Sequence, residues 1–254
     1  MGAKQIEVDV SRTTARSRAD EAGAPTPGAE LPAAPSFIDL LADEAADASL
    51  RKGERTRRRV LWATAAALAD TSFAQLNMDQ IAQAADVSRA ALYQYVGSKE
   101  DAVRTVLTDF QSRTIAIPLQ ATRGATPRET ILRTNRYYID YFAKNAAFME
   151  RVRELHAVMP ELIQEKQRVN RAWAERVARN AARHGASDLP PETLRLRAYL
   201  LECLIDDTLR EIFVIGNPDM TEAARDLDVL AEELTRIWFL TLFSREEPPL
   251  SRPT

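Results

Sequence analysis

The sequence predicts an all-α protein. Within its 254 residues, no segment shows sustained period-two alternation of apolar and polar side chains between hairpin turns. After residue 117, Pro and Gly fall in clusters, and the stretches between them are rich in Ala, Leu, Glu and Arg. Apolar residues recur at spacings of three and four, as in Val103, Val106, Leu107 and Phe110. The helical period therefore accounts for the apolar pattern.

Composition and charge divide the chain into four parts. Residues 1–50 carry four basic and nine acidic side chains, and we expect a mostly disordered extension there, with residues 1–35 as an arm and a short helix within 36–50. Residues 51–99 carry eight basic and four acidic side chains and form a cationic module. Residues 100–245 predict a larger helical domain, and residues 246–254 are a tail.

Several classes of protein are excluded by what the sequence holds. Cys203, His156 and His184 are the chain's entire supply of cysteine and histidine, so we predict no metal site and no cofactor. No Gly-rich phosphate loop or Ser-His-Asp set is present, and we predict that the chain is not an enzyme. No apolar run approaches the length of a membrane span, so we expect a cytoplasmic protein without a membrane partner.

The cationic module predicts helices joined by short, well-marked breaks. Asn77 and Ser88 are good N-caps because their side-chain oxygens can accept from unpaired amides of a first helical turn. Gly97 is expected to end the helix that Ser88 begins, in a conformation with positive φ. The expected helices run over 54–70, 78–85 and 89–96, and a long fourth helix follows Ser98.

Two short helices joined by a tight turn form a helix-turn-helix, whose second helix enters the major groove of DNA. Val87, Leu92 and Val96 would face the core of the module, which leaves the opposite face free. Arg89 offers a bidentate donor to guanine, whereas the tyrosines and Lys99 are placed for phosphates. The candidate DNA-binding residues are Asn77, Ser88, Arg89, Ala90, Ala91, Tyr93, Gln94, Tyr95 and Lys99.

The stretch ATAAALADTSFAQLNMDQIAQAADVSRAALYQYVGSKEDAV resembles the DNA-binding region of the tetracycline-repressor (TetR/AcrR) family of bacterial regulators. The matching features are Asn77, Ile81-Ala82, Val87-Ser88-Arg89, Leu92-Tyr93, Tyr95 and Ser98-Lys99-Glu100. The departures stand at Ser72, Asp86 and Ala90, where the family often has Gly, and at Ala91 and Val96-Gly97, where it has Thr and Phe-Pro.

This resemblance implies a three-helix DNA-binding domain followed by a C-terminal helical domain for ligand binding and dimerisation. It further implies a homodimer on a near-palindromic, double-stranded DNA operator and a repressor that a small molecule releases.

The last two long helices, expected over 191–215 and 221–243, each carry an apolar stripe. Such stripes are often intramolecular core, but their position and the two-fold symmetry of palindromic sites favour a four-helix dimer seam. The seam candidates are Leu201, Ile205, Ile212, Leu230, Leu234 and Ile237.

Aromatic residues crowd the middle of the chain and predict either core or a pocket for a largely apolar or aromatic effector. Asp206 and Asp207 stand in an otherwise apolar helix. They either pair with Arg210 or with Arg residues across the dimer, or they supply a polar group at the pocket floor. The pocket candidates are Tyr137, Tyr138, Tyr141, Phe142, Phe148, Met149, Trp173 and Asp206.

Two alternatives remain open at the level of sequence. The chain could be a helical adaptor whose cationic segment binds an acidic partner or a membrane surface. The arm is either a dispensable tail or a segment whose first eighteen residues approach DNA, since all its basic residues lie there.

Overall fold

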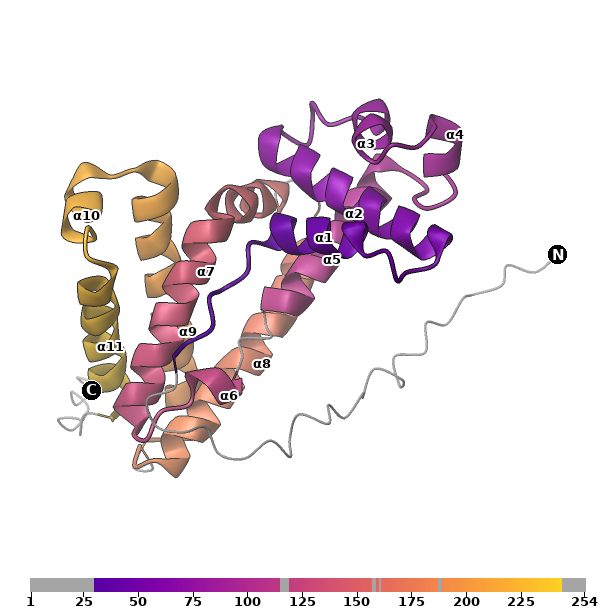
Figure 1. The fold of residues 1–254 in the computed structure, drawn as a ribbon. Coiled ribbons are helices and arrows are strands. Elements are labelled where there is room, and N and C mark those ends of the chain that lie inside the picture. Colours follow the sequence, from indigo (N-terminus) through magenta and orange to yellow (C-terminus); the bar gives the residue numbers. More distant parts are fainter. Residues whose placement is uncertain (1–29, 115–118, 157–158, 160, 187–188, 244–254) are drawn as a thin grey trace, which may run out of the picture.

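The computed structural model describes residues 30–114, 119–156, 159, 161–186 and 189–243 (Figure 1). These residues form helices and connecting loops without a strand, so the all-α prediction is confirmed. Within these ranges, no helix combines the length and the low polarity that crossing a bilayer requires.

The N-terminal domain gathers five helices, seen at the upper right of Figure 1. Fully buried Leu68, Ile81, Leu92 and Leu107 come from four different helices and form its core. Helices as short as α3 and α4 are not stable alone, so their stability comes from packing these side chains together. The elements are α1 (Phe37–Ala46), α2 (Lys52–Asp70), α3 (Met78–Ala84), α4 (Arg89–Leu92) and α5 (Lys99–Thr114).

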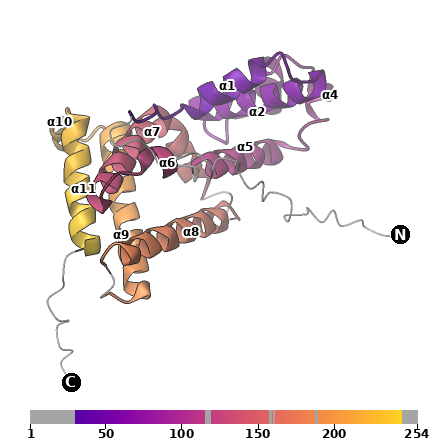
Figure 2. The same ribbon diagram turned by 60° about the horizontal axis from the view of Figure 1, so that its bottom comes forward.

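The C-terminal domain is built around α7, which packs against α11, α9 and η3 and also contacts α2. Its core contains Ile139, Leu194, Leu209 and Trp238. Turning the molecule shows α9 and α11 on the far side from α4 (Figure 2). The elements are α6 (Leu119–Thr122), α7 (Pro127–Leu155), α8 (Glu161–Arg183), α9 (Pro191–Arg210), η3 (Glu211–Ile215), α10 (Pro218–Ala223) and α11 (Leu227–Phe243).

The last two helices differ from their predicted bounds. The expected helix over 191–215 changes to a π-helical turn after Arg210 and ends at Gly216, whose φ of +69° favours glycine. The expected helix over 221–243 is interrupted before Leu227. Asp226 causes this restart because its carboxylate accepts from the amides of Asp228, at 2.9 Å, and Val229, at 3.3 Å.

Residues 30–36 correct the prediction that the whole of residues 1–35 is disordered, because they pack along α7. The Ala34 amide donates to the Asp140 carboxylate at 2.8 Å, and the Phe37 amide donates to Asn145 Oδ1 at 2.7 Å. In return, Asn145 Nδ2 donates to the Pro35 carbonyl at 3.0 Å. The sequence concealed this contact because the partners lie more than a hundred residues away. Residues 1–29, and with them the hypothesis on the first eighteen, lie outside the described residues.

The segment from residue 30 to residue 46, named here the N-terminal strap, joins the two domains. Its helix α1 lies across α2, and the Phe37 ring packs between Phe110 of α5 and Phe148 of α7, with centroids 5.0 and 5.1 Å away. Glu44 accepts from Arg113 of α5, at 2.9 Å, and from Arg58 of α2, at 3.1 Å. The strap therefore contacts α2, α5 and the C-terminal domain at once.

Candidate nucleic-acid interface and internal pockets

The start of α3 is fixed by a reciprocal cap. Asn77 Oδ1 accepts from the Gln80 amide, and Gln80 Oε1 accepts from the Asn77 amide, both at 3.0 Å. At the start of α4, the Ser88 hydroxyl accepts from the Ala91 amide at 3.1 Å. The Ser98 hydroxyl likewise accepts from the Asp101 amide at 3.1 Å. The predicted N-caps are thus confirmed, and they set the orientation of each helix in the motif.

The turn between α3 and α4 needs a residue in the left-handed region. Asp86 has a φ of +53°, the one positive value outside glycine among the described residues. Aspartate tolerates this conformation better than most side chains, and glycine tolerates it best. This geometry explains why glycine suits the position in the family that the motif resembles. The carboxylate of Asp86 also accepts from Arg59 at 3.3 Å, which ties the turn to α2.

Helix α4 is shorter than the helix predicted over 89–96, and Gly97 does not end it through a positive φ. After Leu92 the chain tightens, with the amides of Gln94 and Tyr95 donating to carbonyls three residues back. Positive φ occurs among the described glycines at Gly185 and Gly216, not at Gly97. A Cβ at Gly97 would stand 2.8 Å from a carboxylate oxygen of Asp101, so a larger residue there would need this exposed side chain to move.

The outer face of α4 carries the side chains expected to read bases. Leu92 is fully buried beneath it, while Ala90, Tyr93 and Gln94 are exposed. Arg89 Nη1 donates to the Asp79 carboxylate at 3.1 Å, with both side chains largely exposed. Its neighbours Tyr93 and Asp79 raise the pKa of Arg89, so the guanidinium stays charged, and its bond to Asp79 ties it to α3.

Two predicted phosphate contacts are placed differently. Tyr95 is only partly exposed and packs against the core of the module. Lys99 Nζ donates to the Phe73 carbonyl at 2.9 Å and lies 4.4 Å from the centre of the Phe73 ring. Lys99 therefore stabilises the loop before α3, and this role is independent of any phosphate.

The basic block at the start of α2 is partly neutralised inside the protein. Arg58 pairs with Glu44 and Glu54, each at 3.1 Å, and Arg59 pairs with Asp86. Arg57 is exposed on the same helix. Only part of the positive charge in this segment is thus available to an external anion.

Two small cavities of about 130 and 100 Å³ adjoin each other between α7, α8 and α9. The Tyr138 hydroxyl donates to Asp206 Oδ1 at 2.6 Å in their shared wall. Arg210 instead binds Glu150, at 2.7 Å, so the alternative that pairs Asp206 with Arg210 is wrong. Phe142 and Met149 line the cavity of 130 Å³, and Trp173 lines the cavity of 100 Å³.

Three pocket candidates lie elsewhere. Tyr141 and Phe148 are buried in the core of the N-terminal domain beside Phe110. Tyr137 lines a separate surface hollow next to Leu31. Four aromatic residues in six positions point around most of a helix, so they reach different neighbours. Glu202 lines both cavities but was not among the sequence candidates. Its spacing of four from Asp206 could have indicated it, because that spacing places both carboxyls on one helical face.

Burial and the neighbouring Asp206 raise the pKa of Glu202 to about 7. Lys166 and Asn170 of α8 oppose this shift but do not cancel it. Burial also raises the pKa of Asp206, although its hydrogen bond from Tyr138 acts in the opposite direction. The pocket therefore contains one carboxyl group that titrates near neutral pH.

Glu202→Gln is expected to stabilise the protein more at pH 8 than at pH 5. Between pH 4.5 and about 7, the unfolded chain has lost the Glu202 proton while the folded chain retains it. Folding stability therefore falls as pH rises through this window, and the loss is complete above it. Thermal melting at pH 5, 6, 7 and 8 measures the effect. An equal difference between variant and unmodified protein at every pH would contradict it.

Most of the residues predicted for a dimer seam lie inside the chain and not on its surface. Leu201, Ile205, Ile212 and Leu234 are buried in the core of the chain itself, and Leu230 is partly buried. Ile237, at 40% exposure, is the one seam candidate on the surface. The exposed stripe consists of Leu196, Leu200 and Cys203 on α9 and of Val229, Ile237 and Leu240 on α11.

Residues 60–105 match the sequence model described as bacterial regulatory proteins, tetR family. None of the curated protein sequences matches the chain. Solved structures with the same fold include the fatty acid degradation regulator FadR from Bacillus halodurans, with a TM-score of 0.56 and 18% identity over 74% of this chain and 95% of that one.

Two further solved structures share this arrangement. One is a TetR-like transcriptional regulator from Rhodococcus sp. RHA1, with a TM-score of 0.55 and 18% identity over 77% of this chain and 100% of that one. The other is MexZ, a repressor responsible for antibiotic resistance in Pseudomonas aeruginosa, with a TM-score of 0.54 and 20% identity over 75% of this chain and 96% of that one. The capped helix-turn-helix therefore lies within the part of the chain, residues 60–105, that matches the tetR family model, and these solved structures share the fold over about three quarters of the chain.

Proposed function

We propose that the protein is a transcriptional repressor that binds a near-palindromic operator as a homodimer and is released by a small molecule. The observation that carries this proposal is the motif α3–α4, in which buried Leu92 anchors a short helix whose outer face presents Arg89, Ala90, Tyr93 and Gln94. An exposed polar and aromatic face on a capped helix suits the major groove. Ala91, partly buried, is close enough to the same face to touch a thymine methyl.

Arg89→Ala is expected to cost about 1–3 kcal/mol of operator binding and to relax preference at one base position in each half-site. The reason is that a bidentate donor to guanine is lost. Arg89→Lys is the matched variant, because it keeps the charge but not the planar fork. Binding of both variants to a set of operators with single base changes separates the loss of charge from the loss of the bidentate donor. If Arg89→Ala shows the same base preference as the unmodified protein, the placement of α4 in the major groove is wrong.

The effector is proposed to bind between α7, α8 and α9, beside Tyr138, Phe142 and Asp206. Phe110 and Gln111 of α5 line the same cavity, and α5 begins directly after the DNA-binding motif. A ligand that enlarges this small cavity would displace α5 and change the separation of the two recognition helices. Differential binding to the two arrangements would then lower operator affinity.

Homodimerisation is proposed through the exposed stripe on α9 and α11. Leu196 and Leu200, each 59% exposed, are spaced four residues apart, and Ile237 and Leu240 are spaced three apart. Each pair therefore lies on one helical face, and a two-fold axis would bring the two faces of each subunit together. Because α9 and α11 are in contact, these exposed apolar side chains lie on neighbouring helices, which favours a protein–protein interface.

Selection of bound fragments from a random pool of duplex DNA tests the proposed function. Enrichment of an inverted repeat, with affinity that falls steeply as salt rises, is expected. Salt-sensitive binding to acidic polymers without any enriched sequence would support the adaptor alternative instead. Fragments bearing a single half-site would contradict the homodimer.

A further inference from the structure

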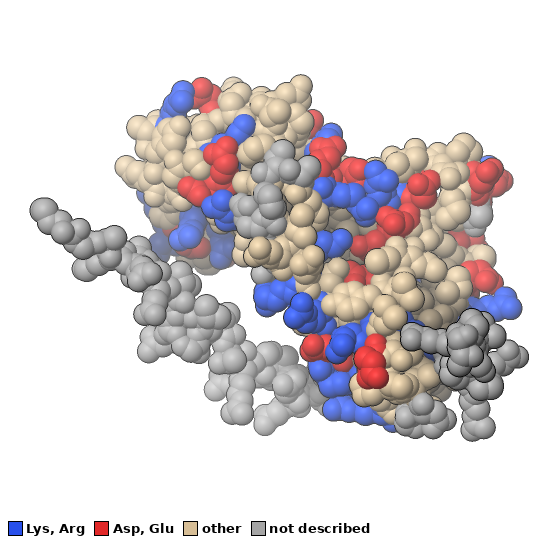
Figure 3. Space-filling view, turned by 180° about the vertical axis from the view of Figure 1, so that it is seen from behind, with Lys and Arg blue, Asp and Glu red and all other residues tan. Residues whose placement is uncertain are grey.

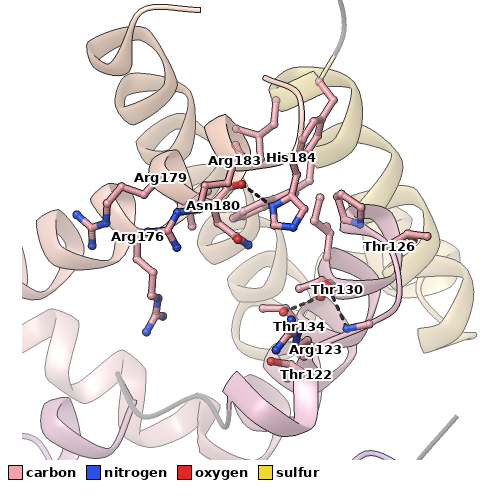
Figure 4. A pocket seen from close by; sticks show the side chains of 18 of the residues that line it. Thr122, Arg123, Thr126, Thr130, Thr134, Arg176, Arg179, Asn180, Arg183 and His184 are labelled. Carbon is pink, nitrogen blue, oxygen red and sulfur yellow. Dashed lines mark hydrogen bonds between the residues drawn. The ribbon is translucent and has the colours of Figure 1, made fainter. Parts of the chain in front are cut away.

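A third cavity, of about 570 Å³, is larger than both of the cavities between α7, α8 and α9 (Figure 4). Helix α6, the last turns of α8 and the end of α11, which border it, lie at the end of the C-terminal domain farthest from α3 and α4 in Figure 1. The cavity lies between the turn before α7, the last turns of α8 and the end of α11. Its volume falls within the range of about 300–1,000 Å³ typical of small-molecule sites. Trp173 and Trp238, whose rings meet edge to face at 5.5 Å, separate it from the smaller cavity that contains Asp206.

The wall of this cavity is positively charged, although the whole chain has a net charge of −3. Arg176, Arg179 and Arg183 come from α8, and Arg123 faces them from the loop after α6 (Figure 4). No Asp or Glu is among the residues that line it in the described part of the chain. Basic side chains gather at this end of the surface in Figure 3.

Nearby carboxylates leave most of this charge uncompensated. Glu129 accepts from the Ala125 amide at 2.8 Å and so caps the turn. Glu175 pairs with Arg179, at 3.7 Å. Arg176 is partly buried and has no ion pair with any described residue, and burial and the nearby Arg179 both lower its pKa. Keeping Arg176 charged in this partly buried position costs free energy, and an anion beside it would offset that cost.

The inner side of the cavity is aromatic and apolar. Ile131 and Val177 line it together with the two tryptophans. Trp238 is 6% exposed, and its Nε1 N–H is buried without a hydrogen-bond partner among the described residues. A buried donor of this kind normally has an acceptor, which a ligand in the cavity would supply.

We propose that this cavity binds an organic anion, in which a carboxylate or phosphate group attached to a flat apolar body pairs with Arg176 and Arg183 while the body packs against Trp173 and Trp238. The anionic group stays on the arginine side because Asp206 and Glu202 lie beyond the tryptophans and would repel it. Trp173 and Trp238 form a wall between this site and the proposed effector cavity, and the anion site lies on the other side of that wall. Binding there does not depend on DNA binding.

Isothermal titration calorimetry with three probes tests the proposal: 2-naphthoate, 2-naphthyl phosphate and the neutral 2-naphthamide. We expect one or both anions to bind at least about tenfold more tightly than the amide, since charged hydrogen bonds are the stronger ones. Whichever anion binds more tightly identifies the headgroup. Equal affinity for anions and amide, or no binding of any probe, would overturn the proposal.

Arg176→Met keeps the apolar stem and removes the charge, so it should weaken anion binding about tenfold or more and leave the amide unaffected. Arg171→Met is the matched control, because it removes the same charge from an exposed position of α8 outside the cavity. If Arg176→Met fails to fold by circular dichroism, Arg183→Met, at an exposed position, replaces it. A folded variant that retains full anion affinity would refute the site.

Discussion

Leu200→Glu will convert the protein to monomers and abolish tight operator binding. Leu200 is 59% exposed in the single chain, at the middle of the stripe on α9, so the chain itself will fold normally with glutamate there. In the proposed dimer the same carboxylate would be buried without a partner, which costs several kcal/mol per subunit. Separate monomers would then bind the two half-sites independently and lose the gain in affinity that comes from joining two DNA-binding domains in one dimer.

Sedimentation velocity at micromolar concentration measures the assembly, and circular dichroism checks the fold. Ile163→Glu is the matched control, because Ile163 is an exposed apolar residue, at 37%, on α8 and outside the stripe. It should leave both the dimer and operator binding intact. A Leu200→Glu protein that still sediments as a dimer would move the interface to another face.

Phe37→Ala will lower the free energy of unfolding by about 3–5 kcal/mol, the usual cost of deleting a buried aromatic side chain. Phe37 is 2% exposed and fills the space between Phe110 and Phe148, so its removal leaves a cavity where three helices meet. The neighbouring Ile38→Ala, which removes a partly buried side chain, should cost less.

Urea denaturation of the three proteins, monitored by circular dichroism, compares these values. The two variants are matched in position and differ in burial, so a general weakening of α1 would affect them alike. A loss below 1 kcal/mol in Phe37→Ala would mean that the strap does not pack on the body of the protein.

The features that the sequence predicted well are local ones. Asn77 and Gln80 are three residues apart and satisfy each other's amides, so their cap needs nothing beyond the segment itself. Leu92 could be assigned to the core because the short helix has a single apolar face. The same locality allowed the family resemblance to be found within residues 63–103, which lie inside the range 60–105 that the family model matches.

The features that were missed depend on distant neighbours. Helix α9 is apolar on the side of Leu201 and also on the side of Leu200, and its sequence does not tell which side the rest of the chain covers. Burial of Leu201 is decided by packing on α7 and α8. The order of residues 30–36 likewise depends on Asn145 and Asp140, which their own composition does not indicate.

The N-terminal strap also sets where this protein can be cut and recombined. A chimera that joined the helix-turn-helix of this chain to another regulator's C-terminal domain at α5 would separate Phe37 from Phe148 and the Phe37 amide from Asn145. The exchanged unit would then carry an exposed aromatic surface and a helix without its anchor. A boundary that works must keep residues 30–46 with α7 of the same protein, so in this chain the DNA-binding module is not an interchangeable part.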